Sequence, residues 1–231
     1  MRVAIIENTA VTHHGQVGVA LHEAAARIEV FRPWKDGILP EPAAHDALIA
    51  FGGGQSALAD ESHPYLPRLA RLMQETGASG RAVLGICLGA QVMARGLGAT
   101  NHLGIAQEFG WCQVAKLAAA KDDPVMAELP DLFPIFQWHS DTFTLPKGTV
   151  QLASSDRAPV QCFRVYRAAY GMQFHFEASR AMVQDWNATF PEEVERNEPG
   201  WLARYPERSE ELGKPADQYG LAIARAWVAL I

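Results

Sequence analysis

The chain has 231 residues, of which 48% are hydrophobic and 20% charged, and its formal net charge at pH 7 is −6. This length suits one large α/β domain, alone or with a short appendage, and the apolar fraction excludes a disordered chain. The negative charge and the lack of Lys and Arg clusters argue against a nucleic-acid partner, and no apolar run is long enough for a signal peptide or a membrane span.

Short β-rich runs alternate with helical stretches in the first hundred residues. The predicted strands are Val3–Ile6, Ile28–Arg32, Ala47–Phe51 and Arg81–Ile86, and the predicted helices are Gly15–Arg27, Tyr65–Thr76 and Leu88–Arg95. This alternation predicts an α/β fold with a mostly parallel central sheet and helices on both faces.

After Gly98 the pattern changes to strands without long helices between them. We expect strands at Gly110–Leu117, Ile135–Trp138, Val150–Ala153, Val160–Val165 and Ala168–Phe176, followed by a helix at Ala178–Thr189. Such closely spaced strands predict a small antiparallel extension. The polar, Pro-containing residues 191–214 are expected to wrap the surface, and Pro215–Ile231 reads as a final helix. We therefore expect a main domain at 1–190 and a helical extension at 191–231, packed on that same domain.

One cysteine stands where a predicted strand runs directly into a predicted helix. Glycines lie two residues before and two residues after Cys87, as in the Gly-x-Ser-x-Gly nucleophile elbow. A helix N-terminus favours a thiolate, and the free N–H of Leu88 could face an oxyanion beside the sulfur. The alternative is a buried cysteine in a glycine-rich turn. Cys112 and Cys162 lack this context and read as core residues.

A thiol nucleophile needs a base, which is often distant in sequence. In residues 172–177, apolar side chains alternate with Gln173, His175 and Glu177. On a strand, His175 and Glu177 would point the same way, so Glu177 could orient the imidazole toward Cys87. The alternative is a solvated polar face of an edge strand.

Four segments together resemble the class I glutamine amidotransferases, of the GMP-synthetase-like, stand-alone type. Residues 85–91 resemble the family's Gly-x-Cys-x-Gly-x-Gln signature, and residues 173–177 its Gln-Phe-His-Pro-Glu. Residues 51–56 resemble its Ser-Gly-Gly-Pro-x-Ser oxyanion strand, and residues 138–141 a stretch that closes over glutamine. The resemblance covers about residues 1–180 and implies a flavodoxin-like three-layer sandwich.

The resemblance also implies a set of catalytic roles. Cys87 would attack the γ-carbonyl of glutamine, His175 would protonate the departing ammonia and later activate water, and Glu177 would orient His175. The N–H groups of Gly53 and Leu88 would form the oxyanion hole.

Substrate contacts are implied for Gln91 and for the Ser140 region, which would hold the amino-acid end of glutamine. Two residues depart from the family pattern: Phe176 and Gly54 each stand where proline is usual. Gly54 is expected to make its loop more flexible, and we read neither change as loss of activity.

Other motifs carry weaker signals. The Gly52–Gly54 run lacks the spacing of a phosphate-binding loop, so no nucleotide cofactor is expected. His13 and His14 are adjacent and have no ligand cluster around them, so no metal site is expected and a polar loop at the rim of the active site is favoured. His139 and Asp141 could instead supply the catalytic base, but the resemblance favours a substrate loop.

Three functions remain open at this point. The first is a glutaminase or amidotransferase that passes ammonia to an unseen acceptor. No P-loop follows the histidine segment, so the acceptor would need a synthetase partner. The second is a γ-glutamyl peptidase that acts on γ-glutamyl peptides or glutathione conjugates, and the third is a non-catalytic module that senses glutamine or binds a partner. The unpaired cysteines favour a cytoplasmic location, and neither a membrane nor a nucleic acid is expected as partner.

Overall fold

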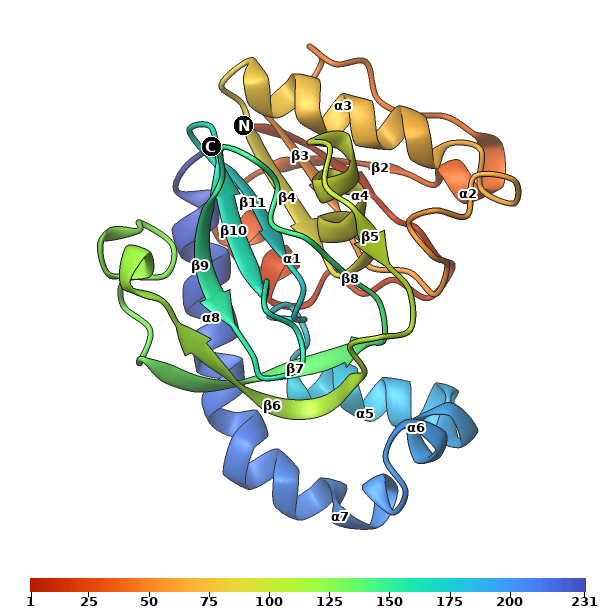
Figure 1. Cartoon of the computed structure of the whole chain (residues 1–231), viewed down its shortest axis with the longest axis vertical. Coiled ribbons are helices and arrows are strands. Elements are labelled where there is room, and N and C mark those ends of the chain that lie inside the picture. The colour runs from red at the N-terminus through yellow and green to blue at the C-terminus, as the bar shows by residue number, and fades with distance from the viewer.

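The centre of the molecule is a nine-stranded mixed sheet with the strand order β2-β1-β3-β4-β11-β10-β9-β6-β7 (Figure 1). The computed structural model describes all residues, 1–231. The strands are β1 (Arg2–Ile6), β2 (Arg27–Phe31), β3 (Ala47–Ala50), β4 (Ala82–Ile86), β5 (Asn101–His102), β6 (Glu108–Lys116), β7 (Leu132–His139), β8 (Thr142–Phe143), β9 (Val150–Ser154), β10 (Cys162–Val165) and β11 (Ala169–Met172). The helices are α1 (Gly15–Glu23), α2 (Pro33–Asp36), α3 (Leu66–Ala78), α4 (Leu88–Gly96), α5 (Arg180–Thr189), α6 (Pro191–Asn197), α7 (Trp201–Arg208) and α8 (Lys214–Val228). A 3₁₀ turn at Ala118–Asp122 and a π-helical turn at Ser209–Gly213 complete the chain.

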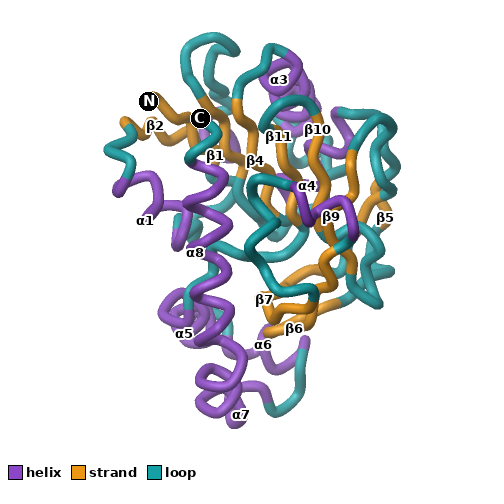
Figure 2. The backbone as a smooth tube through the Cα atoms, turned by 90° about the vertical axis from the view of Figure 1, so that its left-hand side faces the viewer, coloured by secondary structure: helices purple, strands orange, loops and turns teal.

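The parallel part of the sheet is buried on both faces. Strands β2, β1, β3, β4 and β11 run parallel, and every residue of β3, β4 and β11 is buried. Continuous apolar runs are typical of strands covered on both sides. One hydrophobic core includes residues of α1 and α8, and a second core on the other face includes residues of α3 and α4 (Figures 1 and 2). The predicted three-layer α/β sandwich is confirmed.

The antiparallel part continues the same sheet. Strands β11, β10, β9, β6 and β7 pair antiparallel, and a separate pair joins β5 to β8. The predicted antiparallel extension is therefore present. It carries β7 beneath the carboxyl ends of the parallel strands, where α5 and α6 also lie (Figure 1).

Strand β11 is shorter than the sequence pattern indicates. It ends at Met172, whereas the predicted strand extends to Phe176. After Met172 the chain crosses toward β7, because the N–H of Gln173 donates to Gln161 and the N–H of His175 donates to Phe136. The polar residues of this segment are buried like the apolar ones, so their alternation does not mark one wet and one dry face.

Residues 191–214, expected from the sequence to wrap the surface, lie mostly at the surface and form α6, α7 and the π-helical turn. Pro191 stands at the start of α6, where a missing N–H costs nothing. Trp201 is fully buried and its ring packs against Phe109 and Trp111 of β6, with centroids 5.1 and 5.5 Å away. Helix α8 then packs along α1 and β7, which holds the extension on the main domain.

The two chain ends lie close together at the end of the molecule opposite α7 (Figures 1 and 2). No helix combines the length and apolarity that a membrane crossing requires.

Candidate active site

Cys87 sits at a sharp turn between β4 and α4. Its backbone dihedrals are φ 51° and ψ −109°, a left-handed conformation that costs a non-glycine residue about 1–3 kcal/mol. The N–H of Cys87 donates to the carbonyl of Met172 at 2.8 Å, which ties the turn to the end of β11. A Cβ at Gly89 would overlap the carbonyl oxygen of Ala50, and one at Gly85 would lie 2.5 Å from the carbonyl oxygen of Gly89. The flanking glycines therefore let strand and helix approach closely enough to form the elbow.

His175 and Glu177 form a buried pair beside this cysteine. The imidazole Nδ1 lies 2.7 Å from Glu177 Oε1, and the residues are 7% and 2% exposed. A Cβ at Gly52 would touch both partners of the predicted reaction, at 3.1 Å from His175 Cε1 and 3.6 Å from Cys87 Cβ. The structure thus brings together the three residues that the sequence proposed. It does so through a turn after β11 and not through two residues on one strand face.

The protonation of His175 depends on its two neighbours. Burial alone lowers the pKa of the imidazole, yet the net direction is well above its usual value, because the negative charges of Glu177 and of a Cys87 thiolate favour the imidazolium. Such an arrangement favours the protonated form of His175. The other cysteines behave differently: burial raises the pKa of Cys112 to about 11, and burial also raises that of Cys162.

A loop of three glycines faces the elbow. A Cβ at Gly53 would lie 2.9 Å from Leu88 Cδ2 and 3.0 Å from Asn8 Cβ, so this residue contacts the first residue of α4 directly. Leu88 occupies the first helical position, where the N–H has no intrahelical acceptor. Gly53 therefore lies next to the Leu88 side chain, and the role of the two N–H groups as an oxyanion hole stays a prediction.

Three side chains that the sequence analysis missed hold this loop. The amide of Asn8 donates to the carbonyl of Phe51 at 2.7 Å, and the hydroxyl of Tyr65 donates to Asn8 Oδ1 at 3.0 Å. The amide of Gln55 donates to the Asn8 carbonyl and to the Tyr65 hydroxyl, at 3.1 and 2.7 Å. The loop expected to be flexible is thus anchored at both ends. Asn8 follows the carboxyl end of β1, a position that could have marked it for the site.

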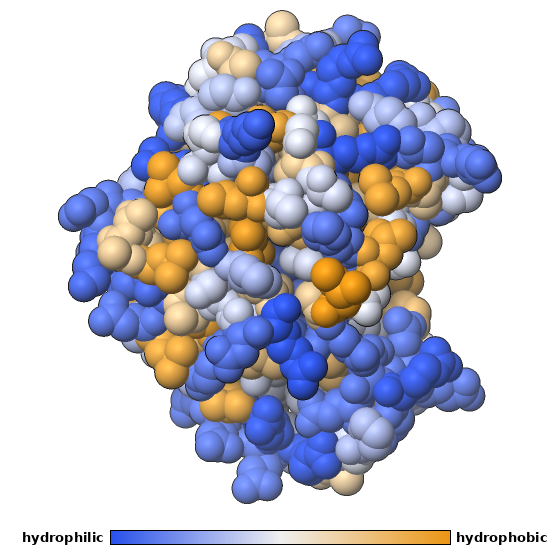
Figure 3. Space-filling view, viewed as in Figure 1, coloured by the Kyte–Doolittle hydropathy of each residue, from blue (hydrophilic) through white to orange (hydrophobic).

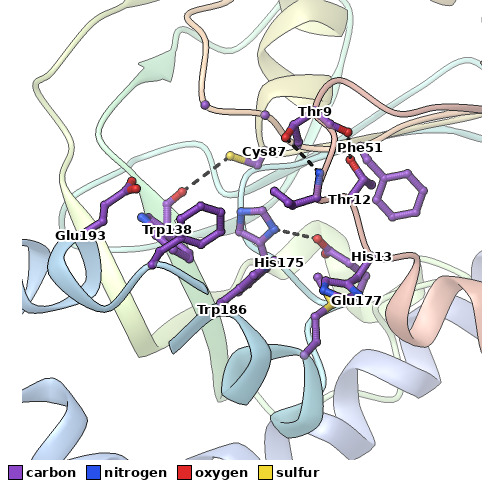
Figure 4. A pocket seen from close by; sticks show the side chains of 16 residues that line it. Thr9, Thr12, His13, Phe51, Cys87, Trp138, His175, Glu177, Trp186 and Glu193 are labelled. Atoms are coloured by element: carbon purple, nitrogen blue, oxygen red, sulfur yellow. Dashed lines mark hydrogen bonds and ion pairs between the residues drawn. The ribbon is translucent and has the colours of Figure 1, made fainter. Parts of the chain in front are cut away.

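The cysteine, the histidine and the glycine loop open into a cavity of about 340 Å³ (Figure 4). Its remaining lining comes from the loop after β1, the ends of β3 and β7, the turn after β11, and helices α5 and α6 with the residue between them. These residues are Thr9, Val11, Thr12, His13, Phe51, Trp138, Glu177, Met182, Trp186, Phe190 and Glu193. The indole of Trp186 meets the His175 ring edge to face, with centroids 5.6 Å apart. Cys87 Sγ lies 3.8 Å from the Trp138 carbonyl oxygen, one of the dashed contacts in Figure 4. In the space-filling view the outline is indented between α6 and the loops above it (Figure 3).

Gln91 and Ser140 do not line this cavity. Gln91 is buried, and its amide donates to the Asp141 carbonyl at 3.3 Å and to Gln173 Oε1 at 3.2 Å. Ser140 is exposed, and its hydroxyl lies 3.4 Å from Asp141 Oδ1. Their contacts with a substrate stay predictions.

The alternative base His139 has other partners. Its ring nitrogens lie 3.0 Å from the Asp141 carbonyl and 3.1 Å from Glu108 Oε2, and it is absent from the cavity lining. His13, in contrast, lines the cavity and pairs with Asp185 at 2.8 Å, which agrees with a rim position. No three side chains of His, Cys, Asp and Glu are grouped so that they could hold a metal ion.

The site therefore combines a three-layer α/β fold with a cysteine at a strand–helix elbow, a neighbouring His–Glu pair and a glycine loop. The chain belongs to the class I glutamine amidotransferase family, because residues 17–184 match the family model described as Glutamine amidotransferase class-I.

Similar proteins agree with this assignment. The chain is 30% identical over 152 residues to the glutamine amidotransferase-like protein YfeJ of Salmonella typhimurium, and the match spans 64% of each chain, less than two thirds of that relative's length. It is 29% identical over 178 residues to one subunit of the glutamine-hydrolysing GMP synthase of Methanoregula boonei, covering 74% of this chain and 89% of that one. A solved glutamine amidotransferase from Thermotoga maritima superposes with a TM-score of 0.86 at 26% identity, covering 99% of this chain and 96% of the other.

Proposed function

We propose that this protein hydrolyses the γ-amide of glutamine through a cysteinyl acyl-enzyme and releases ammonia. The observation that carries the proposal is the strained Cys87 elbow next to the buried His175–Glu177 pair. A left-handed cysteine is costly, and its retention beside a base is typical of a nucleophile. The family assignment supports glutamine as the amide.

In the proposed reaction the Cys87 thiolate attacks the amide carbon of glutamine. The N–H groups of Gly53 and Leu88 stabilise the oxyanion of the tetrahedral intermediate. His175, held as imidazolium by Glu177, gives its proton to the departing nitrogen, so that ammonia leaves and a thioester remains. The neutral imidazole then takes a proton from water, the resulting hydroxide attacks the thioester, and glutamate and the free thiol are released.

Gln91 and Ser140 are proposed to act in substrate binding through the segment that links β7 to β8. The amide of Gln91 holds the Asp141 carbonyl, and His139 holds the same carbonyl from the other side. Backbone groups near Ser140 would then meet the amino-acid end of glutamine after a small movement of this exposed segment.

The released ammonia is proposed to serve a synthetase partner. The similarity to the GMP synthase protein of Methanoregula boonei supports this arrangement, since that protein is named as one subunit of a synthase. All three cysteines are free thiols, which suits the reducing cytoplasm as the place of action.

A γ-glutamyl peptidase is the second candidate, and the cavity wall favours it. Trp138, Trp186, Phe190 and Met182 line the space next to Cys87 and His175. Ammonia needs no apolar wall, whereas a larger leaving group would pack against one.

Release of ammonia from L-glutamine, measured alongside the hydrolysis of γ-glutamyl peptides, tests both candidates. Cys87→Ala should abolish both activities because it removes the nucleophile, while Cys112→Ala should leave them unchanged. Faster turnover of the peptides than of glutamine would favour the peptidase. Glutamine binding without turnover of any γ-glutamyl compound, or activity that persists in Cys87→Ala, would refute the proposal.

A further inference from the structure

One wall of the active-site cavity carries an unpaired carboxylate. Glu193 of α6 lines the cavity, yet its side chain takes part in none of the ion pairs or hydrogen bonds of the protein. Arg196, one turn further along the helix, makes no ion pair with it. The other ionisable groups of the lining have partners: His175 pairs with Glu177, and His13 pairs with Asp185. Glu193 is therefore the one charge of the cavity left without a counter-charge.

Aromatic rings stand beside this carboxylate. The rings of Trp138 and Phe190 are nearly perpendicular, at 81°, with centroids 6.0 Å apart. Trp186 meets Trp138 at 78° with centroids 5.4 Å apart. All three side chains line the cavity, and in Figure 4 Trp138 and Glu193 lie on the side of His175 opposite Glu177. Because the rings are nearly perpendicular, at least one ring face is turned toward the space between them. A cation is attracted to an aromatic ring face within about 6 Å of the ring centroid.

The charge of the cavity points the same way. Its lining contains no Lys and no Arg, so nothing in it offers a fixed positive charge to an anionic group. Glu177 already brings one carboxylate to the lining, and Glu193 adds a second. A substrate that brings a positive charge is therefore favoured over one that brings a negative charge.

We propose that the corner formed by Trp138, Phe190 and Glu193 binds an ammonium group of the substrate. This inference rests on the proposed hydrolysis of γ-glutamyl amides and names the chemistry that the site selects. The ammonium has two possible sources. It is either the α-ammonium of the glutamyl part or a terminal ammonium on the amine that leaves.

Four substrates separate the two sources when Glu193→Gln is compared with wild type. L-Glutamine is paired with 5-amino-5-oxopentanoate, which lacks the α-ammonium. The γ-glutamyl amide of 1,4-diaminobutane is paired with that of butylamine, which lacks the terminal ammonium. We expect Glu193→Gln to raise KM about fivefold, equivalent to about 1 kcal/mol, only for substrates that carry the recognised ammonium, with kcat nearly unchanged.

An α-ammonium site predicts that the rise in KM affects glutamine and both γ-glutamyl amides and spares 5-amino-5-oxopentanoate. A leaving-group site predicts a rise for the diaminobutane amide alone. Glu192→Gln is the matched control, since Glu192 neighbours Glu193 on α6 but does not line the cavity. An equal effect of Glu193→Gln on all four substrates, or no effect on any, would overturn the inference.

A binding measurement keeps the inference testable if the protein turns over none of these compounds. Calorimetric titration of the same four compounds into Cys87→Ala, with and without Glu193→Gln, should show the same pattern in Kd. Absence of turnover in wild type would refute the proposed hydrolysis, whereas an unchanged Kd in the double variant would refute the ammonium site. The two failures are therefore distinguishable.

Discussion

Replacement of Glu177 by Gln tests the proposed role of this buried carboxylate in orienting and charging His175. The carboxylate is 2% exposed, and its Oε1 lies 2.7 Å from His175 Nδ1. The substitution keeps the size of the side chain and removes its charge. The new NH₂ group has two possible positions. At the place of Oε2, which has no hydrogen-bond partner, it is left unsatisfied. At the place of Oε1 it faces His175 Nδ1 and disfavours the tautomer in which Nδ1 carries the proton.

The expected loss follows from the charge that is removed. A hydrogen bond to a charged group contributes about 1.5–3 kcal/mol, and loss of one partner of a buried charge pair costs about 3–5 kcal/mol. Because glutamine retains one acceptor, we expect about 2–4 kcal/mol of lost transition-state stabilisation. That corresponds to a decrease in kcat/KM of roughly thirtyfold to a thousandfold.

The pH dependence adds a signature that a merely structural defect would not give. Glu177 raises the pKa of His175, so its removal lets the imidazolium lose its proton at lower pH. Departing ammonia needs that proton, so the alkaline limb of kcat/KM should move to lower pH in Glu177→Gln.

The assay is ammonia release from glutamine across pH, with thermal unfolding to confirm that the variant folds. Asp185→Asn is the matched control, because the His13–Asp185 pair has the same chemistry at 2.8 Å but its side chains are 41% and 56% exposed. This control should change kcat/KM less than about threefold. A Glu177→Gln protein with nearly full activity and an unmoved alkaline limb would refute the assigned role.

Two further predictions concern the elbow and the glycine loop. Gly53→Ala should lower kcat by about tenfold or more, because a Cβ there would lie 2.6 Å from Gln55 Oε1 and 2.9 Å from Leu88 Cδ2. Gly54→Ala should have a much smaller effect, because its Cβ meets nothing within 4 Å. Steady-state kinetics on both variants test this, and equal losses would contradict the placement of the oxyanion hole. Iodoacetamide near neutral pH should label Cys87 faster than the two cysteines whose pKa is raised by burial, as read by peptide mass spectrometry, and equal labelling of all three would count against an activated thiol.

The candidate catalytic residues could be singled out from the sequence because their signals are local. The glycines around Cys87 mark a turn that only small residues permit, and the apolar runs before it predict buried parallel strands. The two-residue spacing of His175 and Glu177 also indicates their pairing, although a turn after β11 brings them together. An alternating pattern is typical of a strand with one solvated face, and this segment is buried throughout, so the pattern predicts a β11 that is too long.

The cavity wall could not be predicted because its residues meet only through distant packing. Phe190 and Glu193 reach the site because α6 packs on α7, and Trp201 of α7 packs against Phe109 and Trp111. The sequence of residues 191–214 is polar and Pro-containing, and no local rule shows that Trp201 is fully buried against β6. The anchoring of the glycine loop by Asn8 likewise depends on contacts across 43 and 57 residues.

The residues assigned to the chemistry lie in one part of the chain, whereas part of the cavity wall comes from outside it. Cys87, His175, Glu177 and the glycine loop lie within residues 17–184, which match the family model. The cavity segment at residues 9–13 and the residues Phe190 and Glu193 lie outside that range. Membership of the family supports an amide of glutamine as substrate, and we expect the flanking segments to influence which γ-glutamyl compound reaches the thiol. Substitutions in those segments should change the ranking of substrates by KM while the reactivity of Cys87 toward a small alkylating agent stays the same.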